Sequence, residues 1–525
     1  MRDSRFVPGL GARGKSPAAF ERRCIPRGLR CSSVEYAQHA PSSRRATRAP
    51  RRSRRHAGFH HGLLAAALMM GAGVAAAQAP EAPASAAAPT FARDVAPIVF
   101  DHCASCHRPG DIAPMSFLSY REVRPWARAI RDKVVSREMP PWHAAPGGVP
   151  IRNVRSLSQA QIDTVAAWAD AGAPLGDPAD LPPLPVFTAN EWHHPSGRPP
   201  DIVLELPVVM QIPADGELPY YNLYSEIPFE EDVFAEAVEM LPGNRSVVHH
   251  MSAHVTTLPA GTTIVDGAPY LDGRPLTAGE IRSASDRDSN VLGAGAAKLI
   301  CFVPGRGFEM FHDGVAKRVP AGKFLRWSLH YNVTGRPETD HSRIGIWTAR
   351  GPVTHEMLSR TIGSPLPTTP ERTLPVTVNG EEVPRRAVPP IPPHADDWEI
   401  VMRTDVAEPI TFYAISPHMH LRGKDMRFLL RWPDGREDVL LDVPRYDFNW
   451  QTEFELVEPL RIPAGSTLTV EGHYDNSYRN RYNPAPQKEV YWGEQSWDEM
   501  FEGWIKYSID SQDLTAVRTT EVQQE

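Results

Sequence analysis

The most specific chemical signal in the chain is a pair of cysteines followed directly by a histidine, in Cys103-Ala104-Ser105-Cys106-His107. Two thiols spaced i and i+3 can add to the two vinyl groups of one haem, and the adjacent imidazole can reach the iron from the same side. Chance would produce this motif roughly 0.002 times in a chain with this cysteine and histidine content. A thioredoxin-like redox pair or half of a zinc site are the alternatives, but neither has a second cysteine pair to support it. The motif therefore predicts one covalently attached haem c.

The haem iron needs a second axial ligand, and Met139 is the best candidate for it. Met139 stands before Pro140-Pro141, which favours an extended backbone that could direct the thioether toward the iron. Met115 is the rival, although it lies only eight residues after His107. An ordinary core methionine is the alternative role for Met139. The region from Phe91 to Pro174 resembles small single-haem cytochrome c domains, which are all-α.

Further along the chain, histidines and a methionine stand at spacings that suit a metal. They are His249, His250, His330, His418, His420 and Met500. Side chains at i and i+2 of a strand share a face, so His418 and His420 can bind one ion. The adjacent His249 and His250 would need a bulge to converge. Imidazole combined with thioether favours copper. By spacing alone, solvent-facing or core histidines remain an equally good explanation.

Between Tyr220 and Asp510 the chain resembles the copper type II ascorbate-dependent monooxygenases, the family of the peptidylglycine alpha-hydroxylating and dopamine beta-monooxygenases. Four stretches carry the resemblance in the right order: Val248–Met251, Leu329–Tyr331, Pro417–Leu421 and Asp498–Met500. The resemblance implies two coppers, one held by His249, His250 and His330, the other by His418, His420 and Met500. It also implies that O2 reacts at the second copper while the first supplies an electron, so that a C–H bond of a small organic substrate is hydroxylated.

Two positions depart from the family pattern. Members that act on glycine-extended peptides hold the substrate carboxylate with an arginine and a tyrosine, and Ser416 and Trp504 stand at those positions here. A glycine-extended peptide is therefore not the expected substrate. The disulfides of the animal enzymes cannot form either, because Cys301 is the only cysteine after the haem motif.

The elements that must position these residues can be outlined from composition. The chain has 525 residues, 41% of them hydrophobic, with 53 prolines and 37 glycines, which suits short strands and many turns. The last helix of the N-terminal region should carry Leu157, Ile162, Val165 and Trp168 and end at Gly172-Ala173-Pro174. After Asp201, short β-branched runs separated by turns predict two all-β, jelly-roll-like sandwiches.

One internal repeat supports two related sandwiches. Residues 320–331 and 463–474 both begin with Pro-Ala-Gly and end with His-Tyr, at His330 and at His473. His473 could also approach the second copper, or it could be a packing residue at a strand end. The proline-rich stretch 363–393 either separates the sandwiches or forms a long loop of the second. The expected organisation is a leader over 1–79, a cytochrome domain over 80–177, a proline-rich linker over 178–200, sandwiches over 201–355 and 356–515, and a tail over 516–525.

The leader reads as a signal for export. Residues 1–61 hold 15 Lys and Arg against 3 Asp and Glu, and residues 62–77 hold no charge. A basic segment, a short apolar run and small residues at Ala75–Ala79 are typical of a secretory signal peptide cleaved near Ala77–Ala79. A membrane anchor is the alternative, although the apolar run is short for a span. The acidic remainder argues against a nucleic-acid partner.

These observations predict a periplasmic or secreted copper-dependent monooxygenase that receives electrons through its fused haem. Ascorbate or a periplasmic redox protein would be the donor. The alternative is a non-catalytic haem–copper protein that transfers electrons or binds copper. A third possibility, an adhesion-type sandwich with a haem sensor, predicts no copper uptake.

Overall fold

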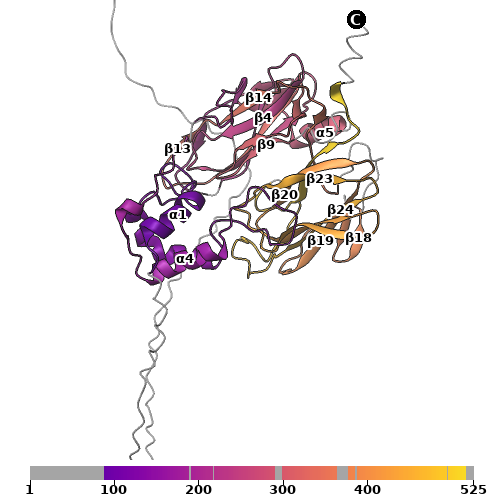
Figure 1. The fold of residues 1–525 in the computed structure, drawn as a ribbon. Coiled ribbons are helices and arrows are strands. Elements are labelled where there is room, and N and C mark those ends of the chain that lie inside the picture. Colours follow the sequence, from indigo (N-terminus) through magenta and orange to yellow (C-terminus); the bar gives the residue numbers. More distant parts are fainter. Residues whose placement is uncertain are drawn as a thin grey trace, which may run out of the picture. The chain divides into compact units, whose positions relative to one another are not determined.

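A computed structural model describes residues 88–515, apart from 189–190, 217, 290–297, 364–375, 385–386 and 494. The predicted leader and signal peptide therefore lie outside the described residues. The fold is mostly β-sheet with few helices, as the sequence predicted for the region after Asp201. Figure 1 shows most of the helices grouped in the N-terminal part of the described chain, and the remainder mainly as strands with one helix, Ala278–Ser289, among them.

The N-terminal helices enclose a small core of their own. They are η1 (Phe91–Val95), α1 (Ala96–His102), α2 (Tyr120–Val123), η2 (Arg124–Trp126), α3 (Ala127–Val135), α4 (Gln159–Asp170) and η3 (Pro178–Asp180). The expected last helix is present as α4, but Leu157 lies outside it, because the helix begins after a capping box between Ser158 and Gln161. Its residues Ile162, Val165 and Trp168 are buried at helical spacing. The indole N–H of Trp168 donates to the Pro174 carbonyl and so ties the chain after the helix back to the helix.

The first β region contains two sheets that share one core. Its strands are β1 (Ile202–Glu205), β2 (Met210–Ile212), β3 (Tyr221–Glu226), β4 (Val233–Leu241), β5 (Val248–Thr256), β6 (Thr263–Val265), β7 (Ala268–Leu271), β8 (Arg274–Pro275), β9 (Lys298–Phe302), β10 (Phe308–Met310), β11 (Val315–Val319), β12 (Phe324–Tyr331), β13 (Glu338–Asp340), β14 (Arg343–Thr348) and β15 (His355–Glu356), with helix α5 (Ala278–Ser289). One sheet has the order β1-β14-β4-β11-β15 with β10 beside β4, and the other has β3-β12-β5-β9. Apolar side chains from both sheets are buried against one another, among them Val238, Ile344, Ala253 and Trp327. This is the arrangement of a sandwich.

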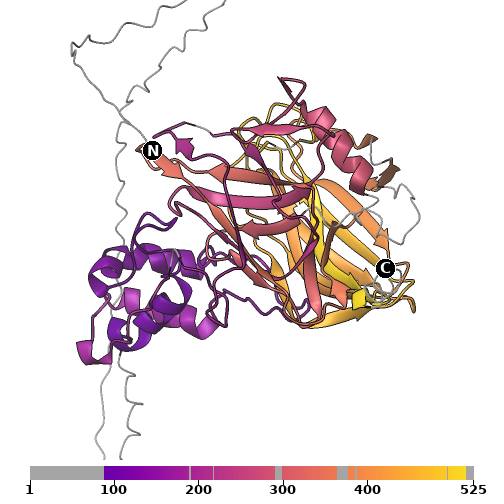
Figure 2. The same ribbon diagram turned by 90° about the horizontal axis from the view of Figure 1, so that it is seen from above.

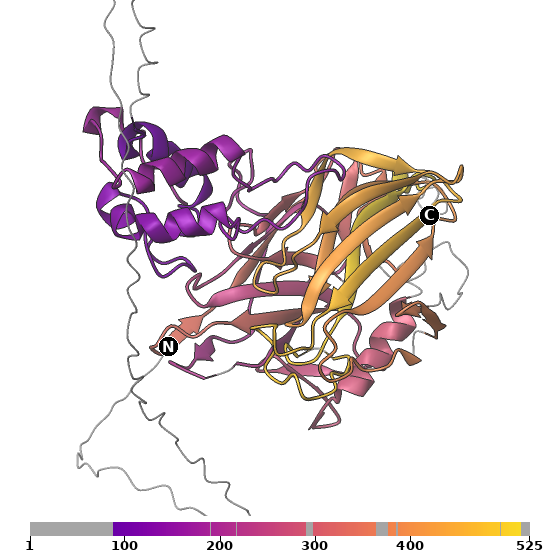
Figure 3. The same cartoon turned by 90° about the horizontal axis from the view of Figure 1, so that it is seen from below.

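The second β region repeats that plan. Its strands are β16 (Leu358–Thr361), β17 (Val376–Val378), β18 (Glu381–Val383), β19 (Trp398–Asp405), β20 (Ile410–Met419), β21 (Gly423–Arg431), β22 (Glu437–Val443), β23 (Phe454–Ile462), β24 (Thr467–Tyr474) and β25 (Phe501–Ile509). The sheets β16-β25-β20-β23 and β18-β17-β19-β24-β21-β22 enclose a second core. Figures 2 and 3 show these orange and yellow strands running side by side in layers. Part of the proline-rich stretch 363–393 thus belongs to this sheet, because β17 and β18 pair next to β19.

The internal repeat corresponds to equivalent strands. β12 lies between β3 and β5, β24 lies between β19 and β21, and both strands alternate half-buried and buried residues over eight positions. Each follows a turn whose glycine has positive φ, at Gly322 (65°) and Gly465 (83°). Both glycines therefore occupy the left-handed backbone region that side chains with a Cβ avoid.

The segment after α3 packs against the second β region instead of the helices. Trp142 meets Phe454 edge-to-face with ring centroids 5.0 Å apart, and the N–H of Arg152 donates to the carbonyl of Glu455 at 2.7 Å. The Arg155 guanidinium donates to the carbonyls of Pro304 (3.2 Å) and Gly305 (2.6 Å) in the first β region. The helices are thereby joined to both β regions within the compact unit Ala82–Glu525. In the part of the chain that is described, no helix is long and apolar enough to cross a membrane.

A candidate two-centre histidine site

Three histidines meet where β5 pairs with β12. His330 is opposite His250, but the next residue, Tyr331, is opposite Val248, so His249 is the extra residue of a β-bulge. A bulge places two consecutive side chains on one side of a strand, which regular alternation forbids. The predicted bend at His249 and His250 is therefore confirmed.

The three imidazoles face one another through their Nδ1 atoms. The Nδ1 of His249 lies 3.1 Å from the Nδ1 of His250 and 3.3 Å from the Nδ1 of His330. Candidate ligand atoms of all three side chains lie within 4.8 Å of one another. Nitrogen lone pairs at this separation need a proton or a cation between them, and a metal ion satisfies all three at once.

Burial keeps these imidazoles in the form that binds metals. It lowers the pKa of His249 to about 4 and that of His330 to about 3, and it holds the pKa of His250 well below its usual value. All three are therefore neutral near pH 7, so no proton has to leave before a metal ion binds.

His418 and His420 form a second cluster at the end of β20. Their ring centroids lie 5.2 Å apart at an interplanar angle of 88°, while the intervening Met419 is buried in the core. The expectation that the two histidines share a face is thus confirmed. Met500, directly before β25, lines the same cavity as both rings.

Hydrogen bonds orient this second pair. The Nδ1 of His418 lies 2.5 Å from the Gln451 amide oxygen, and the Nδ1 of His420 lies 3.2 Å from the Asp498 carbonyl oxygen. Both oxygens accept, so each Nδ1 carries the proton and each Nε2 presents its lone pair. Burial lowers the pKa of His418 to about 4 and that of His420 to about 3. The pair offers two imidazole nitrogens and one thioether, which is a copper-compatible donor set.

Glu499, the middle residue of Asp498–Met500, secures the chain around this cluster. Its carboxylate accepts the backbone N–H groups of His420 (2.8 Å) and Arg422 (2.7 Å). Burial raises its pKa to about 8, despite these hydrogen bonds and the nearby Arg422 guanidinium. Glu499 thus ties the loop that carries Met500 to the end of β20.

Two aromatic side chains join the clusters. The Tyr220 hydroxyl lies 2.6 Å from the Nε2 of His250, and the Tyr220 ring stacks on His330 with centroids 4.6 Å apart. The same ring lies 6.3 Å from His420. Phe448, from the second β region, lies 5.8 Å from both His330 and His420. Sequence reasoning missed both residues, because neither forms a motif with the ligands.

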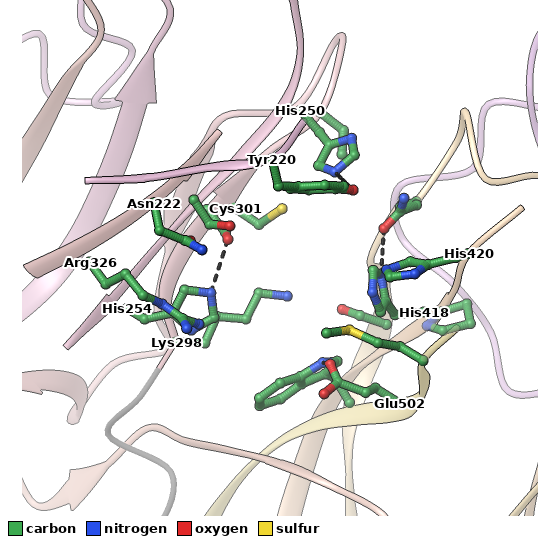
Figure 4. Close-up of a pocket in the computed structure, with 18 residues that line it drawn as sticks. Tyr220, Asn222, His250, His254, Lys298, Cys301, Arg326, His418, His420 and Glu502 are labelled. Carbon is green, nitrogen blue, oxygen red and sulfur yellow. Dashed lines mark hydrogen bonds between the residues drawn. The ribbon is translucent and has the colours of Figure 1, made fainter. Parts of the chain in front are cut away.

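A cavity of about 320 Å³ opens beside both clusters and is lined by residues of both β regions. His250, His418, His420 and Met500 line it together with charged side chains at Lys298, Arg326 and Glu502. Figure 4 shows Lys298, Arg326 and His254 on one side of the cavity, opposite His418, His420 and Glu502. The strands β9 and β12 supply the two cationic residues.

The Cys103–His107 stretch continues from α1 in a tight turn. The backbone N–H of Cys103 donates to Val99, and that of His107 donates to Cys103, both at 2.9 Å. This turn brings side chains at i, i+3 and i+4 to one side. Both thiols are free, and burial raises the pKa of Cys103 to about 12. The His107 ring stacks on Phe117, with centroids 4.3 Å apart.

The two methionine candidates for the haem lie in different surroundings. Met115 packs against the helical core, as Cys103 also does. Met139 follows α3, and its backbone N–H donates to the Lys133 carbonyl at 3.2 Å. Met139 is half-buried at the start of the segment that leaves the helices for the second β region.

His473, the repeat counterpart of His330, is directed elsewhere. Its Nδ1 lies 2.7 Å from an Asp425 carboxylate oxygen, and its Nε2 lies 3.9 Å from Glu399. Asp425 engages one ring nitrogen and Glu399 lies near the other, so His473 packs between β19, β24 and β21.

No family model matches the chain, and no curated protein matches it. Among the solved structures that the chain matches is one of the Gx strain of infectious bursal disease virus, at 8% identity and a TM-score of 0.15 over 59% of this chain and 72% of that one. A likeness at this level carries no argument about fold or function.

Proposed function

We propose that this protein is an exported copper-dependent monooxygenase that uses O2 to hydroxylate a C–H bond of a small organic substrate and receives electrons through its own haem c. The observation that carries the proposal is the convergence of three neutral Nδ1 atoms at His249, His250 and His330 beside a cavity that also holds His418, His420 and Met500.

The donor sets fit two coppers of different character. His249, His250 and His330 would hold one ion through three nitrogens, a set that suits both oxidation states of copper. His418, His420 and Met500 would hold the other, with a thioether that favours the reduced state. Bound copper would supply one-electron redox chemistry and reactivity toward O2.

The chain's own residues orient these donors and shape the space beside them. Gln451 and Asp498 hold the imidazoles of His418 and His420 by their Nδ1 protons, and Tyr220 holds His250 by its Nε2. Burial keeps all five imidazoles neutral. The cavity has room for a small molecule next to His418, His420 and Met500.

Cys103, Cys106 and His107 fit a covalent haem, because the two thiols are free and share one turn with the imidazole. The Nδ1 of His107 is buried without a hydrogen-bond partner among the described residues, which leaves this nitrogen available, while the ring stacks on Phe117. Arg155 acts electrostatically on the Cys106 thiol and also binds the turn at Gly305 that follows β9. This proximity of the haem motif to the first β region supports electron delivery to the histidines of β5.

Elemental analysis of protein produced in a bacterial periplasm tests the metal content. About one iron and two coppers per chain are expected from the three donor sets. Copper at the level of one ion or none, with haem present, contradicts the proposal. In stopped-flow absorbance, the reduced haem should be reoxidised by O2 only when the protein is loaded with copper.

A single substitution separates copper chemistry from haem attachment. His420→Ala should leave the haem absorbance unchanged, lower copper to about one ion per chain by the loss of an imidazole ligand, and abolish hydroxylation. His394→Ala, at an exposed histidine away from the cavity, is the matched control and should behave as the unmodified protein. Haem–copper protein that consumes O2 without hydroxylated product would favour the electron-transfer alternative.

A further inference from the structure

We infer that the cavity beside the histidine clusters is built for a small organic anion, whose carboxylate or similar group is bound by Lys298. This inference rests on the proposed function, because it names the substrate class of the same site. It assigns a role to residues of β9 and β12 that the copper donor sets leave unused.

The first observation is the state of the Lys298 ammonium. Lys298 lines the cavity and is only half-buried, and its Nζ lies 5.5 Å above the Trp504 ring centre, a cation–π distance. Among the described residues, no carboxylate forms a hydrogen bond or ion pair with this ammonium, although the ammonium acts electrostatically on the buried Glu453. An ammonium held in a cavity without a carboxylate partner attracts an anion from solution, because the low dielectric of the walls strengthens the attraction.

The second observation is the balance of charge along the cavity wall. Lys298 and Arg326 are cationic, and Glu502 is the single carboxylate among the lining residues. Glu502 already accepts a hydrogen bond from the indole N–H of Trp504 at 2.7 Å. The wall therefore has a net positive charge concentrated on the side formed by the first β region, as Figure 4 shows for Lys298 and Arg326.

The third observation is the apolar part of the lining. Trp504, Pro417 and Val303 line the cavity together with the ring of Tyr220. An inorganic ion would leave these surfaces and most of the 320 Å³ unused, whereas an organic anion would fill both the charged and the apolar parts. A substrate held by its anionic group at Lys298 would direct its other end toward His418 and His420 on the opposite wall (Figure 4).

Ser416 and Trp504, the two positions that depart from the family pattern, both line the cavity that Lys298 also lines. Ser416 and Trp504 carry no charge with which to hold a substrate, but Trp504 lies against Lys298, which comes from the other β region. The cation for substrate binding is thus supplied across the cavity, from a strand that no ligand motif marks.

Calorimetric titration of the anaerobic holoprotein tests the inference without turnover. The probes are phenylacetate, phenylacetamide and 2-phenylethylammonium, which have similar size and carry a negative, a neutral and a positive head group. Phenylacetate should bind roughly 10- to 100-fold more tightly than the amide, the difference expected for a charge-assisted hydrogen bond. Equal binding of the three probes, or no phenylacetate binding at millimolar concentration, overturns the inference.

Variants of Lys298 identify the group responsible. Lys298→Met keeps the length of the side chain and should remove the preference for phenylacetate, and Lys298→Arg should retain it. Lys298→Gln provides a second neutral variant in case methionine disturbs folding, and Lys488→Met, at an exposed lysine, is the matched control. Unchanged phenylacetate affinity in both neutral variants overturns the assignment of Lys298.

Two further measurements distinguish this inference from a site for inorganic anions and from the proposed function itself. Inorganic phosphate or chloride that displaces phenylacetate at equal concentration would show a site for inorganic anions and overturn the substrate assignment. Copper content, measured on the same samples, reports on the proposed function independently. A preference for phenylacetate in protein that binds no copper would contradict the proposed monooxygenase function and support anion binding in the cavity. Two coppers per chain without that preference would support the monooxygenase function and contradict anion binding.

Discussion

Tyr220 is the residue through which the two histidine clusters contact each other most directly. Its hydroxyl is within hydrogen-bond distance of the Nε2 of His250, while its ring stacks on His330 and faces His420. Because the Nδ1 of His250 faces the other two imidazoles, the hydrogen bond at Nε2 fixes both the tautomer and the ring orientation.

Tyr220→Phe keeps the stacked ring and removes only the hydroxyl. We expect copper at the histidine triad to bind about 10-fold more weakly or worse, the usual cost of losing a group that orients a metal ligand. Competition with a copper chelator measures the affinity. Tyr221→Phe is the control, since Tyr221 packs against Tyr331 on the neighbouring position of β3. Equal copper affinity in both variants would show that Tyr220 does not orient His250.

Lys317 is a buried cation whose effect on stability depends on pH. Burial lowers its pKa to about 8, and its Nζ donates to the Ser359 hydroxyl at 3.1 Å. The charged groups around it include Lys506, Glu309 and Glu356. The pKa of Lys317 is lower in the folded state than in the unfolded state. The free energy of unfolding therefore increases as the pH rises from about 8 toward the usual lysine pKa.

Lys317→Met should therefore stabilise the protein most below about pH 8, and this advantage should shrink as the pH rises above 8. Urea unfolding of the variant and the unmodified protein at several pH values between about 7 and 10 measures how their stability difference changes with pH. Groups that titrate equally in both proteins cancel in this difference. An advantage that grows with pH would contradict the lowered pKa of Lys317.

At the scale of elements, a single β-bulge decides whether the first cluster exists. Sequence spacing required a bend at His249 and His250, and β5 provides it opposite His330. The repeat strands β12 and β24 share turn, burial pattern and terminal His-Tyr, yet only β12 contributes to a cluster. The difference arises because β24 pairs with strands that place Glu399 and Asp425 opposite His473.

The repeat therefore offers a matched pair of substitutions. His330→Ala should lower copper from two ions to about one, since it removes one of three imidazole ligands. His473→Ala should leave copper unchanged, because the side chain contacts Asp425 and Glu399 instead of the cavity. Elemental analysis of the two variants in parallel provides the measurement. Copper loss in His473→Ala would place a ligand where this structure shows a contact with the Asp425 carboxylate.

At the scale of the whole molecule, a buried ionic network joins the two β regions next to the cavity. Arg306 of the first region donates to Glu453 (2.7 Å) and to Glu455 of the second. Lys506 donates to Glu453 (2.9 Å) and to Glu309, and Ser416 also donates to Glu453 at 2.9 Å. Burial alone would lower the pKa of Arg306, but Glu453 and Glu455 hold it above its usual value.

Arg306→Met removes one partner of this network and leaves Glu453 and Glu455 without their guanidinium. Breaking a buried pair from one side costs about 3–5 kcal/mol in the free energy of unfolding. Urea unfolding measures the loss, and Arg479→Met, at an exposed arginine, should change stability little. A loss below about 1 kcal/mol would mean that the network adds nothing to the contact between the β regions.

The sequence by itself determined the chemistry that the chain can offer. Residue type and spacing singled out the Cys-x-x-Cys-His sequence, the need for a bulge if His249 and His250 are to converge, the shared face of His418 and His420, and the mostly β character after Asp201. These are local properties, because each depends on neighbours within a few positions along one strand or helix.

Only the tertiary structure decided which distant residues meet. Tyr220, Lys298, Phe448 and Gln451 carry no motif, and they join the histidines through pairing and packing between strands far apart in sequence. His330 and His473 are indistinguishable within their repeats, and the strands beside them place one in a candidate metal cluster and the other against the Asp425 carboxylate. The physical reason is that burial, electrostatics and cavity shape depend on long-range contacts, which spacing along the chain does not specify.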